Sequence, residues 1–247
     1  MKKNLFPVLI LSLSVAFAGC KKDEDETPIP PDPTPVEEND APAQTTPTIA
    51  GADAALWSIN SHSSINGIAV SIGTAVGYFS EDANFETFVD AGNVSVDGQT
   101  MDQYDNNSYG LYPSPTNPMG IDFDDSVIWE VSGGNGVEGF TQTSDFTWPN
   151  VPDINSAGTV SKSSGYTASV PYIENADSVY FLIGEVIKSL PGNAVSCTFT
   201  AEELSGLENG TNIVSINATR TEYEVIGGKT VYFGKMASRS KTVTIED

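Results

Sequence analysis

The residues best suited to bind a metal ion are three carboxylates that lie close together in the chain. Asp122, Asp124 and Asp125 occur in the segment 121–126. Calcium takes about six to eight oxygen ligands, and closely spaced carboxylates can supply several of them. The segment lacks the glycine and terminal glutamate of an EF-hand loop, and on a strand Asp122 and Asp124 would share an outward face. We therefore expect a solvated strand face and no cofactor, with a calcium site as the alternative.

Aromatic side chains in the same part of the chain could bind a sugar. Tyr104, Tyr109, Tyr112 and Trp148 lie among Asn and Asp residues. An aromatic ring presents a flat apolar surface on which a sugar ring can stack, and neighbouring polar groups can bind the hydroxyls. A sandwich of this size also needs aromatic residues in its core. Packing in the core or at its rim is therefore the favoured interpretation, and a glycan-binding platform is the alternative.

The side chains of common catalytic centres are scarce. The chain has one histidine, His62, and two cysteines, Cys20 and Cys197. A Cys/His metal centre, a Cys–His nucleophile and a disulfide framework are therefore unsupported. We expect His62 in an exposed loop before the first strand and Cys197 as a small buried apolar residue.

Motifs for catalysis are also missing. The sequence contains no Gly-x-Ser-x-Gly elbow and no phosphate-binding loop. Carboxylate pairs suitable for glycoside hydrolysis will occur by chance among so many acidic residues. We therefore expect a protein without enzymatic activity, and a glycoside hydrolase is the third hypothesis.

The charge of the chain is strongly negative and unevenly distributed. Acidic residues number 33 and basic residues 11, which gives a net charge of -22. Between Ile49 and Ser161 there are 15 Asp and Glu and no Lys or Arg. A nucleic-acid partner is excluded because phosphate contacts need a basic surface. Repulsion between like charges favours a soluble monomer.

The first residues have the pattern of an export signal. Lys2 and Lys3 precede an uncharged apolar run over 5–17, which is too short to cross a bilayer as a helix. The segment Phe17-Ala18-Gly19-Cys20 resembles the lipobox of bacterial lipoproteins, although Phe17 replaces the usual leucine. The resemblance implies a signal peptide over 1–19, cleavage before Cys20 and lipidation of that cysteine. The partner so implied is a membrane, bound through the lipid anchor.

The next segment, 20–48, is predicted to be a disordered stalk. It begins with a charged run over 21–26 and continues with Pro-rich sequence almost without large apolar side chains. An acidic run at this place resembles the export signal of surface lipoproteins of the Bacteroidetes type. The resemblance implies a position on the outer face of the outer membrane, and a periplasm-facing lipoprotein is the alternative.

The remaining sequence predicts an all-β protein of two units. Apolar and polar residues alternate with period two, and Gly, Asn, Asp and Pro separate the runs. In the acidic domain, 49–152, we expect a second sandwich-like unit, with strands at 68–76, 93–97, 120–124 and 126–131. In 153–247 we expect an antiparallel immunoglobulin-like β-sandwich, with strands at 166–170, 179–183, 195–200, 213–218, 222–226, 230–233 and 242–245.

Two local features of the C-terminal half are predicted more precisely. Gly227-Gly228 should form a hairpin turn, and Ala201–Leu207 a helical turn capped by Thr200 with Glu203 three residues later. The segments 199–207 and 241–245 resemble the tail of Bacteroidetes-type lipoproteins with Ig-like modules, a family that implies no activity. The function expected is a non-catalytic binding or adhesion module of the cell surface, whose partner is an extracellular glycan or protein.

Overall fold

The computed structural model describes residues 51–65, 68–82, 85 and 87–247, which belong to one compact unit, Ala41–Asp247. The lipobox, Cys20 and the stalk expected over 20–48 lie outside the described residues. The described part is almost entirely β-structure, and its one helix is the single turn α1 (Ala201–Leu204). The prediction of an all-β fold is confirmed. Within the described residues no helix is long and apolar enough to cross a membrane.

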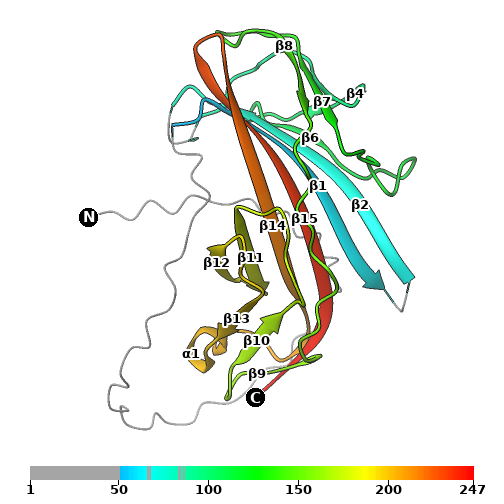
Figure 1. The fold of residues 1–247 in the computed structure, drawn as a ribbon, viewed down its shortest axis with the longest axis vertical. Coiled ribbons are helices and arrows are strands. Elements are labelled where there is room, and N and C mark those ends of the chain that lie inside the picture. The colour runs from blue at the N-terminus through cyan, green and yellow to red at the C-terminus, as the bar shows by residue number, and fades with distance from the viewer. Residues whose placement is uncertain (1–50, 66–67, 83–84, 86) are drawn as a thin grey trace. The chain divides into compact units, whose positions relative to one another are not determined.

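A large mixed sheet forms the centre of the unit (Figure 1). Eight of its strands follow the order β12-β11-β14-β15-β1-β2-β6-β5, and β9 also pairs with β15. Neighbours are antiparallel, except that β15 pairs in parallel with β1 and with β9. Its strands are β1 (Ala54–Ile65), β2 (Ile68–Phe79), β5 (Asp102–Gln103), β6 (Tyr109–Leu111), β9 (Thr159–Ser161), β11 (Ser178–Ile183), β12 (Val186–Pro191), β14 (Gly210–Ile226) and β15 (Lys229–Glu246).

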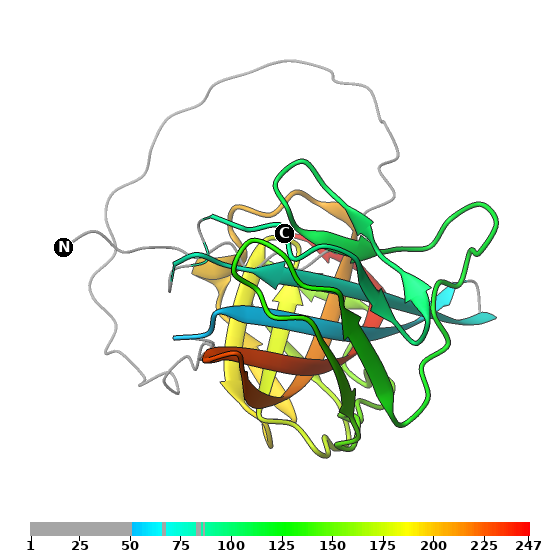
Figure 2. The same ribbon diagram turned by 90° about the horizontal axis from the view of Figure 1, so that it is seen from above.

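Two smaller sheets complete the sandwich (Figure 2). One has the order β4-β3-β7-β8, with strands β3 (Val94–Val96), β4 (Gln99–Thr100), β7 (Val127–Val131) and β8 (Phe140–Ser144). The other pairs β10 (Tyr166–Ser169) with β13 (Ser196–Phe199). The first smaller sheet shares a core with β1 and β15, which includes Leu56, Trp129 and Phe233. The second shares a core with β11 and β14, which includes Phe181 and Phe199.

A polar row separates the two cores. Arg220 of β14, Lys235 of β15 and Ser58 of β1 are direct neighbours across three strands. On β15, Phe233 belongs to the first core and Ala237 to the second, on either side of Lys235. One hairpin therefore supplies both cores, although the domain boundary predicted at 152–153 falls between β8 and β9 in the sequence.

The long hairpin replaces four predicted strands by two. The strands expected at 213–218 and 222–226 are both parts of β14, and those expected at 230–233 and 242–245 are parts of β15. The residues that join the predicted strands, 219–221 and 234–241, include no Pro, Asn or Asp, and Arg220 and Lys235 among them lie at the polar row instead of in a turn. The predicted turn is confirmed, because Gly227 and Gly228 have φ angles of 60° and 80° in a two-residue connection.

Two predictions for the acidic half are wrong. No strand forms at 120–124; Gly120, with φ of 68°, only forms an isolated bridge to Gly73 on β2. A Cβ on Gly73 would lie 2.8 Å from the carbonyl carbon of Ile121, so the two backbones lie in close contact at this parallel bridge. His62 lies on β1 and not in a loop, because pairing with both β2 and β15 supports a strand of small polar residues.

Other local predictions are confirmed. The strands expected at 68–76, 93–97 and 126–131 appear in β2, β3 and β7. Helix α1 has the expected capping box, in which Thr200 accepts from the Glu203 backbone and the Glu203 side chain accepts from the Thr200 backbone. Cys197 is a free, buried cysteine on β13, and burial raises the pKa of its thiol to about 11. Seven strands were not predicted from the sequence: β1, β4, β5, β6, β8, β9 and β12.

Candidate functional site

The large sheet has one face on the cores and one face directed away from them. Side chains of a strand alternate between the two faces. On β15, Phe233 and Lys235 are directed to the cores, so Tyr232 and Gly234 lie on the outer face. On β1 the same alternation puts Leu56 in the core and Trp57 on the outer face. Aromatic side chains of five neighbouring strands and their adjoining loops collect on this outer face.

We call this surface the aromatic face. It consists of Tyr223 of β14, Tyr232 of β15, Trp57 of β1, Tyr78 of β2, Tyr112 after β6 and Tyr104 after β5. Figure 1 shows the first four strands side by side. Because neighbouring strands are about 4.8 Å apart, four steps from β14 to β6 span about 19 Å. The aromatic face is therefore wide enough for a ligand of several rings.

Two glycines allow aromatic rings to lie against the sheet. A Cβ on Gly234, the neighbour of Trp57 across the β1–β15 pair, would overlap the indole and lie 2.6 Å from its Cδ2 atom. A Cβ on Gly110 would lie 2.9 Å from Cζ of Tyr112 and 3.0 Å from Cε2 of Tyr104. Rings that cover glycine backbone in this way direct their other faces outward, where a ligand can stack on them.

The rings also contact one another. Tyr223 and Tyr232 are direct cross-strand neighbours, with ring centroids 5.5 Å apart and planes inclined at 32°. The centroids of Tyr104 and Tyr112 are 6.2 Å apart. The small Ala55 separates Tyr232 from Tyr78 across three strands. Such pairs reduce the conformational freedom of each ring, so less entropy is lost when a ligand binds.

The hydroxyl groups of Tyr78, Tyr104 and Tyr112 remain protonated at neutral pH, because the pKa of each is raised. Burial, together with the nearby Tyr112, raises the pKa of Tyr78 to about 12. Burial also raises the pKa of Tyr104 and of Tyr112 above the ordinary value. A protonated phenol can both donate and accept a hydrogen bond. Exposed polar side chains at 102, 103, 105 and 106 surround Tyr104 and add further donors and acceptors.

The four aromatic residues singled out from the sequence have three different environments. Tyr104 and Tyr112 belong to the aromatic face. Tyr109 is a core residue, 2% exposed, whose hydroxyl accepts from Ala91 N at 2.9 Å and lies 3.0 Å from Asp90 Oδ1. It is therefore unavailable to a ligand. Trp148 is half-buried away from the aromatic face, and its Nε1 donates to the backbone oxygen of Asp124 at 3.0 Å.

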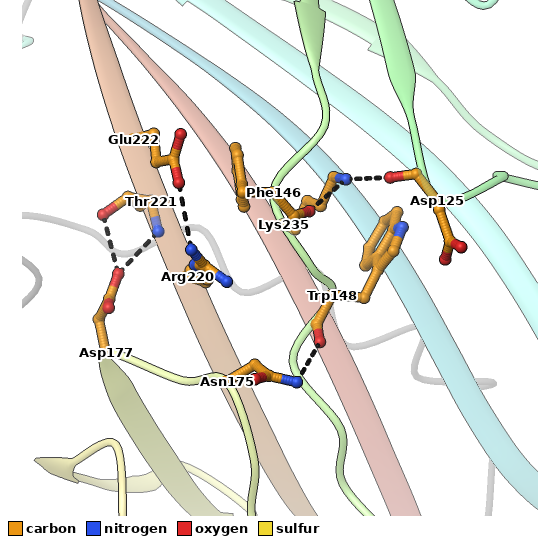
Figure 3. Close-up of polar contacts among 9 residues, drawn as sticks. All are labelled: Asp125, Phe146, Trp148, Asn175, Asp177, Arg220, Thr221, Glu222 and Lys235. Atoms are coloured by element: carbon orange, nitrogen blue, oxygen red, sulfur yellow. Dashed lines mark hydrogen bonds and ion pairs between the residues drawn. The ribbon is translucent and has the colours of Figure 1, made fainter.

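Trp148 forms part of a cluster around a buried lysine (Figure 3). Lys235 is fully buried, and its Nζ donates to the backbone oxygens of Asp125 and, at 2.7 Å, of Phe146. The same atom lies 4.9 Å from the ring centroid of Phe146 and 5.2 Å from that of Trp148. Burial lowers the pKa of this amine. The ammonium thus holds two loops in contact with the polar row and is not accessible to a ligand.

Arg220 lies on the other side of Phe146. Its guanidinium carbon is 5.4 Å from that ring centroid, and Nη2 lies 3.2 Å from Oε1 of Glu222. A shallow depression of about 360 Å³ beside Arg220 includes Asn175 and Asp177. The depression offers hydrogen-bonding groups, but the one cation in it is already paired with Glu222.

The three carboxylates considered as an alternative calcium site do not form one in the described residues. Asp122, Asp124 and Asp125 are all exposed, and the contacts made at Asp124 and Asp125 use their backbone oxygens. Among the described residues, no three His, Cys, Asp or Glu side chains are grouped so that they could hold a metal ion. His62 shares a 2.7 Å hydrogen bond with Ser71, its cross-strand neighbour on β2.

No family model matches the chain, and no curated protein or solved structure matches it significantly. The aromatic face is therefore interpreted from its own chemistry. Four of its residues, Trp57, Tyr78, Tyr223 and Tyr232, were not singled out from the sequence, although period-two alternation on their strands was a usable signal.

Proposed function

We propose that the chain is a non-catalytic, lipid-anchored protein of the bacterial outer membrane, exposed at the cell surface, and that its β-sandwich head binds extracellular glycan. The observation that carries the glycan proposal is the row of aromatic rings across five strands, in which three rings cover the backbone of two glycines. The lipid anchor rests on the lipobox-like segment ending at Cys20 and on the acidic run that follows it.

A glycan fits this surface better than a protein side chain would. Sugar rings have apolar faces of similar size to a phenol ring and hydroxyls at their edges. The aromatic face combines outward ring surfaces with protonated tyrosine hydroxyls and a border of exposed amides and carboxylates near Tyr104. Because a sheet surface is flat and open, a chain of several sugars fits it better than a single sugar enclosed in a pocket.

Glycan binding is tested with a polysaccharide array and the purified head. A favourable aromatic contact contributes about 0.5–1.5 kcal/mol, so removal of one ring should raise Kd about two- to twelvefold. We expect this effect from Trp57→Ala, and a larger one from the pair Tyr104→Ala and Tyr112→Ala. Tyr172→Ala is the matched control, because Tyr172 is 46% exposed and lies off the aromatic face.

Binding that is equal for all of these variants, or no binding to any polysaccharide, would refute the glycan proposal. Release of sugar products during incubation would instead favour the glycoside hydrolase.

The lipid anchor and the cellular position have a separate test. Cys20→Ser should leave the chain uncleaved or soluble and no longer partitioning into detergent. Protease added to intact cells should remove the native head if it faces outward. A mutant that still fractionates with membranes would contradict lipidation, and a head protected in intact cells would support the periplasm-facing alternative.

A further inference from the structure

The last part of β14 is an unpaired sheet edge. β11 pairs with β14 only as far as Thr219, whereas β15 continues to pair with β14 as far as Ile226. Residues 220–226 therefore have a neighbouring strand on one side only. The segment contributes Tyr223 to the aromatic face, but its backbone edge is a feature distinct from the ring surfaces to which the glycan proposal applies.

The backbone groups at this edge are directed away from β15. The N–H of Thr221 donates to Oδ2 of Asp177 at 2.8 Å, which fixes the outward direction at that residue (Figure 3). Because backbone directions alternate with period two, the N–H and C=O groups of Tyr223 and Val225 point the same way. Within the described part of the chain these groups have no hydrogen-bond partner. Unpaired edge groups of this kind can pair with another strand.

The two faces of the edge segment differ in character. Tyr223 and Val225 are the most exposed large apolar side chains of the described residues, at 60% and 64%. The alternate positions, Glu222 and Glu224, are exposed carboxylates on the opposite face. Glu138 adds a third carboxylate against the turn, since a Cβ on Gly227 would lie 2.6 Å from its Oε2. The segment is therefore apolar on one face, and its other face carries these carboxylates together with one cation, Arg220, which is paired with Glu222.

This edge has charged side chains but lacks two other common protections against strand pairing, Pro and Lys. Natural proteins interrupt exposed edges with Pro or Lys. The edge strand at one end of the large sheet, β12, has both, in Pro191 and Lys188. The segment 220–226 has neither, and its apolar residues are exposed.

We propose that the β14 edge binds an extended segment of a partner protein by strand addition, with Lys or Arg at alternate positions and apolar residues between them. Backbone pairing would provide affinity, and the alternating faces would provide specificity. The basic residues would lie beside Glu222 and Glu224. A second copy of this chain fits poorly, because antiparallel pairing centred on Tyr223 would put Glu222 opposite Glu224 of the other copy.

The probe is a fluorescent peptide of seven residues, acetyl-Lys-Val-Lys-Val-Lys-Val-Lys-amide, added to the purified full chain. The control peptide has the same composition with its lysines and valines in two separate blocks. Both peptides carry the same charge, so general attraction to an acidic protein affects them equally. We expect the alternating peptide to bind at least about tenfold more tightly, and to slow amide hydrogen exchange at Tyr223 and Val225.

A matched pair of variants tests the edge itself. Val225→Pro removes an outward N–H without removing a hydrogen bond to β15, whereas Val225→Thr keeps that N–H and the branched shape. We expect Val225→Pro to raise the Kd of the alternating peptide at least about tenfold. Val225→Thr should change that Kd less than about twofold. Glycan binding should be the same for both variants, so this proposal and the proposed function can fail separately.

Three outcomes would overturn the proposal. Equal binding of the two peptides would mean that charge alone attracts them. Protection of amides elsewhere, with Tyr223 and Val225 unaffected, would locate the peptide at another surface. Dimerisation of the chain that Val225→Pro abolishes, measured by light scattering, would mean that the edge takes a second copy.

Discussion

Replacing Lys235 with methionine should destabilise the sandwich at the junction of its two cores. The two side chains have similar length and volume, so packing in the polar row changes little. The backbone oxygens of Asp125 and Phe146 lose their donor, and a buried group left unsatisfied costs about 1–3 kcal/mol. The cation–π contacts with Phe146 and Trp148 are lost as well, about 1–2 kcal/mol.

The desolvation of the ammonium opposes these losses. Burial lowers the pKa of Lys235, which means that the folded protein already disfavours the charged form. Removing the charge recovers part of that cost. We therefore expect a net loss of about 2–4 kcal/mol in the free energy of unfolding, from the difference between the two effects.

Urea and thermal unfolding measure the effect directly. For a protein of this size, 1 kcal/mol corresponds to about 2–4 °C in Tm, so Tm should fall by about 4–16 °C. Lys229→Met is the control, because the side chain of Lys229 makes no hydrogen bond or ion pair with the described residues. That control should change stability by less than about 0.5 kcal/mol.

A second measurement distinguishes the loss of the loop contacts of Lys235 from a general loss of stability. If Lys235 holds the loops, amide exchange at 121–126 and 145–148 should accelerate more than exchange in β11 and β13. An unchanged or raised Tm for Lys235→Met would refute the reasoning. It would mean that the desolvation of the buried ammonium equals or exceeds the stabilisation from its contacts. A lowered Tm without local acceleration would mean that the side chain matters for packing and not for the loops.

Three further predictions concern the close contact between Gly73 and Ile121, stability at alkaline pH, and calcium. Gly73→Ala should destabilise by about 1–3 kcal/mol, because its Cβ would overlap the Ile121 carbonyl, whereas Gly158→Ala, with open space, should be nearly neutral in urea unfolding. Burial raises the pKa of Tyr109 to about 12, so as the pH rises the unfolded chain loses the phenol proton before the folded chain does. The free energy of unfolding should therefore fall between about pH 10 and 12. Tyr109→Phe should make this fall shallower, and an unchanged slope would contradict the prediction. Calcium should raise Tm no more than sodium chloride of matched ionic strength; a larger gain, removed by Asp122→Asn with Asp124→Asn, would reveal a specific site.

Local patterns were sufficient to predict several elements from the sequence. Gly227-Gly228 predicted its turn because each central residue of that turn type needs a positive φ, which glycine adopts without strain. Thr200 and Glu203 predicted the capped turn, because both hydrogen bonds of a capping box form within four residues. Both features depend only on neighbours in the sequence.

The aromatic face could not be predicted in the same way. Alternation within 54–59 indicates that Leu56 and Trp57 lie on opposite faces, but not which strand lies beside Trp57. The β1–β15 pair is parallel and joins distant parts of the chain, so the contact between Trp57 and Gly234 leaves no local pattern. Gly234 by itself indicates a break in a strand. That the indole of Trp57 covers Gly234 follows only from the register of the β1–β15 pair.

The distribution of charge shows how an acidic segment without basic residues can fold. Its carboxylates accept hydrogen bonds from backbone N–H groups: Asp53 from Thr230 N, Asp90 from Gly92 N and Asp97 from Ile128 N, each at 2.7 Å. These bonds need no cation and fix turns and strand ends. Cations of the C-terminal half, such as Lys235, bind backbone oxygens of the acidic half. Carboxylates of the acidic half therefore bind backbone N–H groups, and basic side chains of the C-terminal half bind its backbone oxygens. The net charge remains at the surface, where salt can screen it and where a basic partner strand at the β14 edge would meet it.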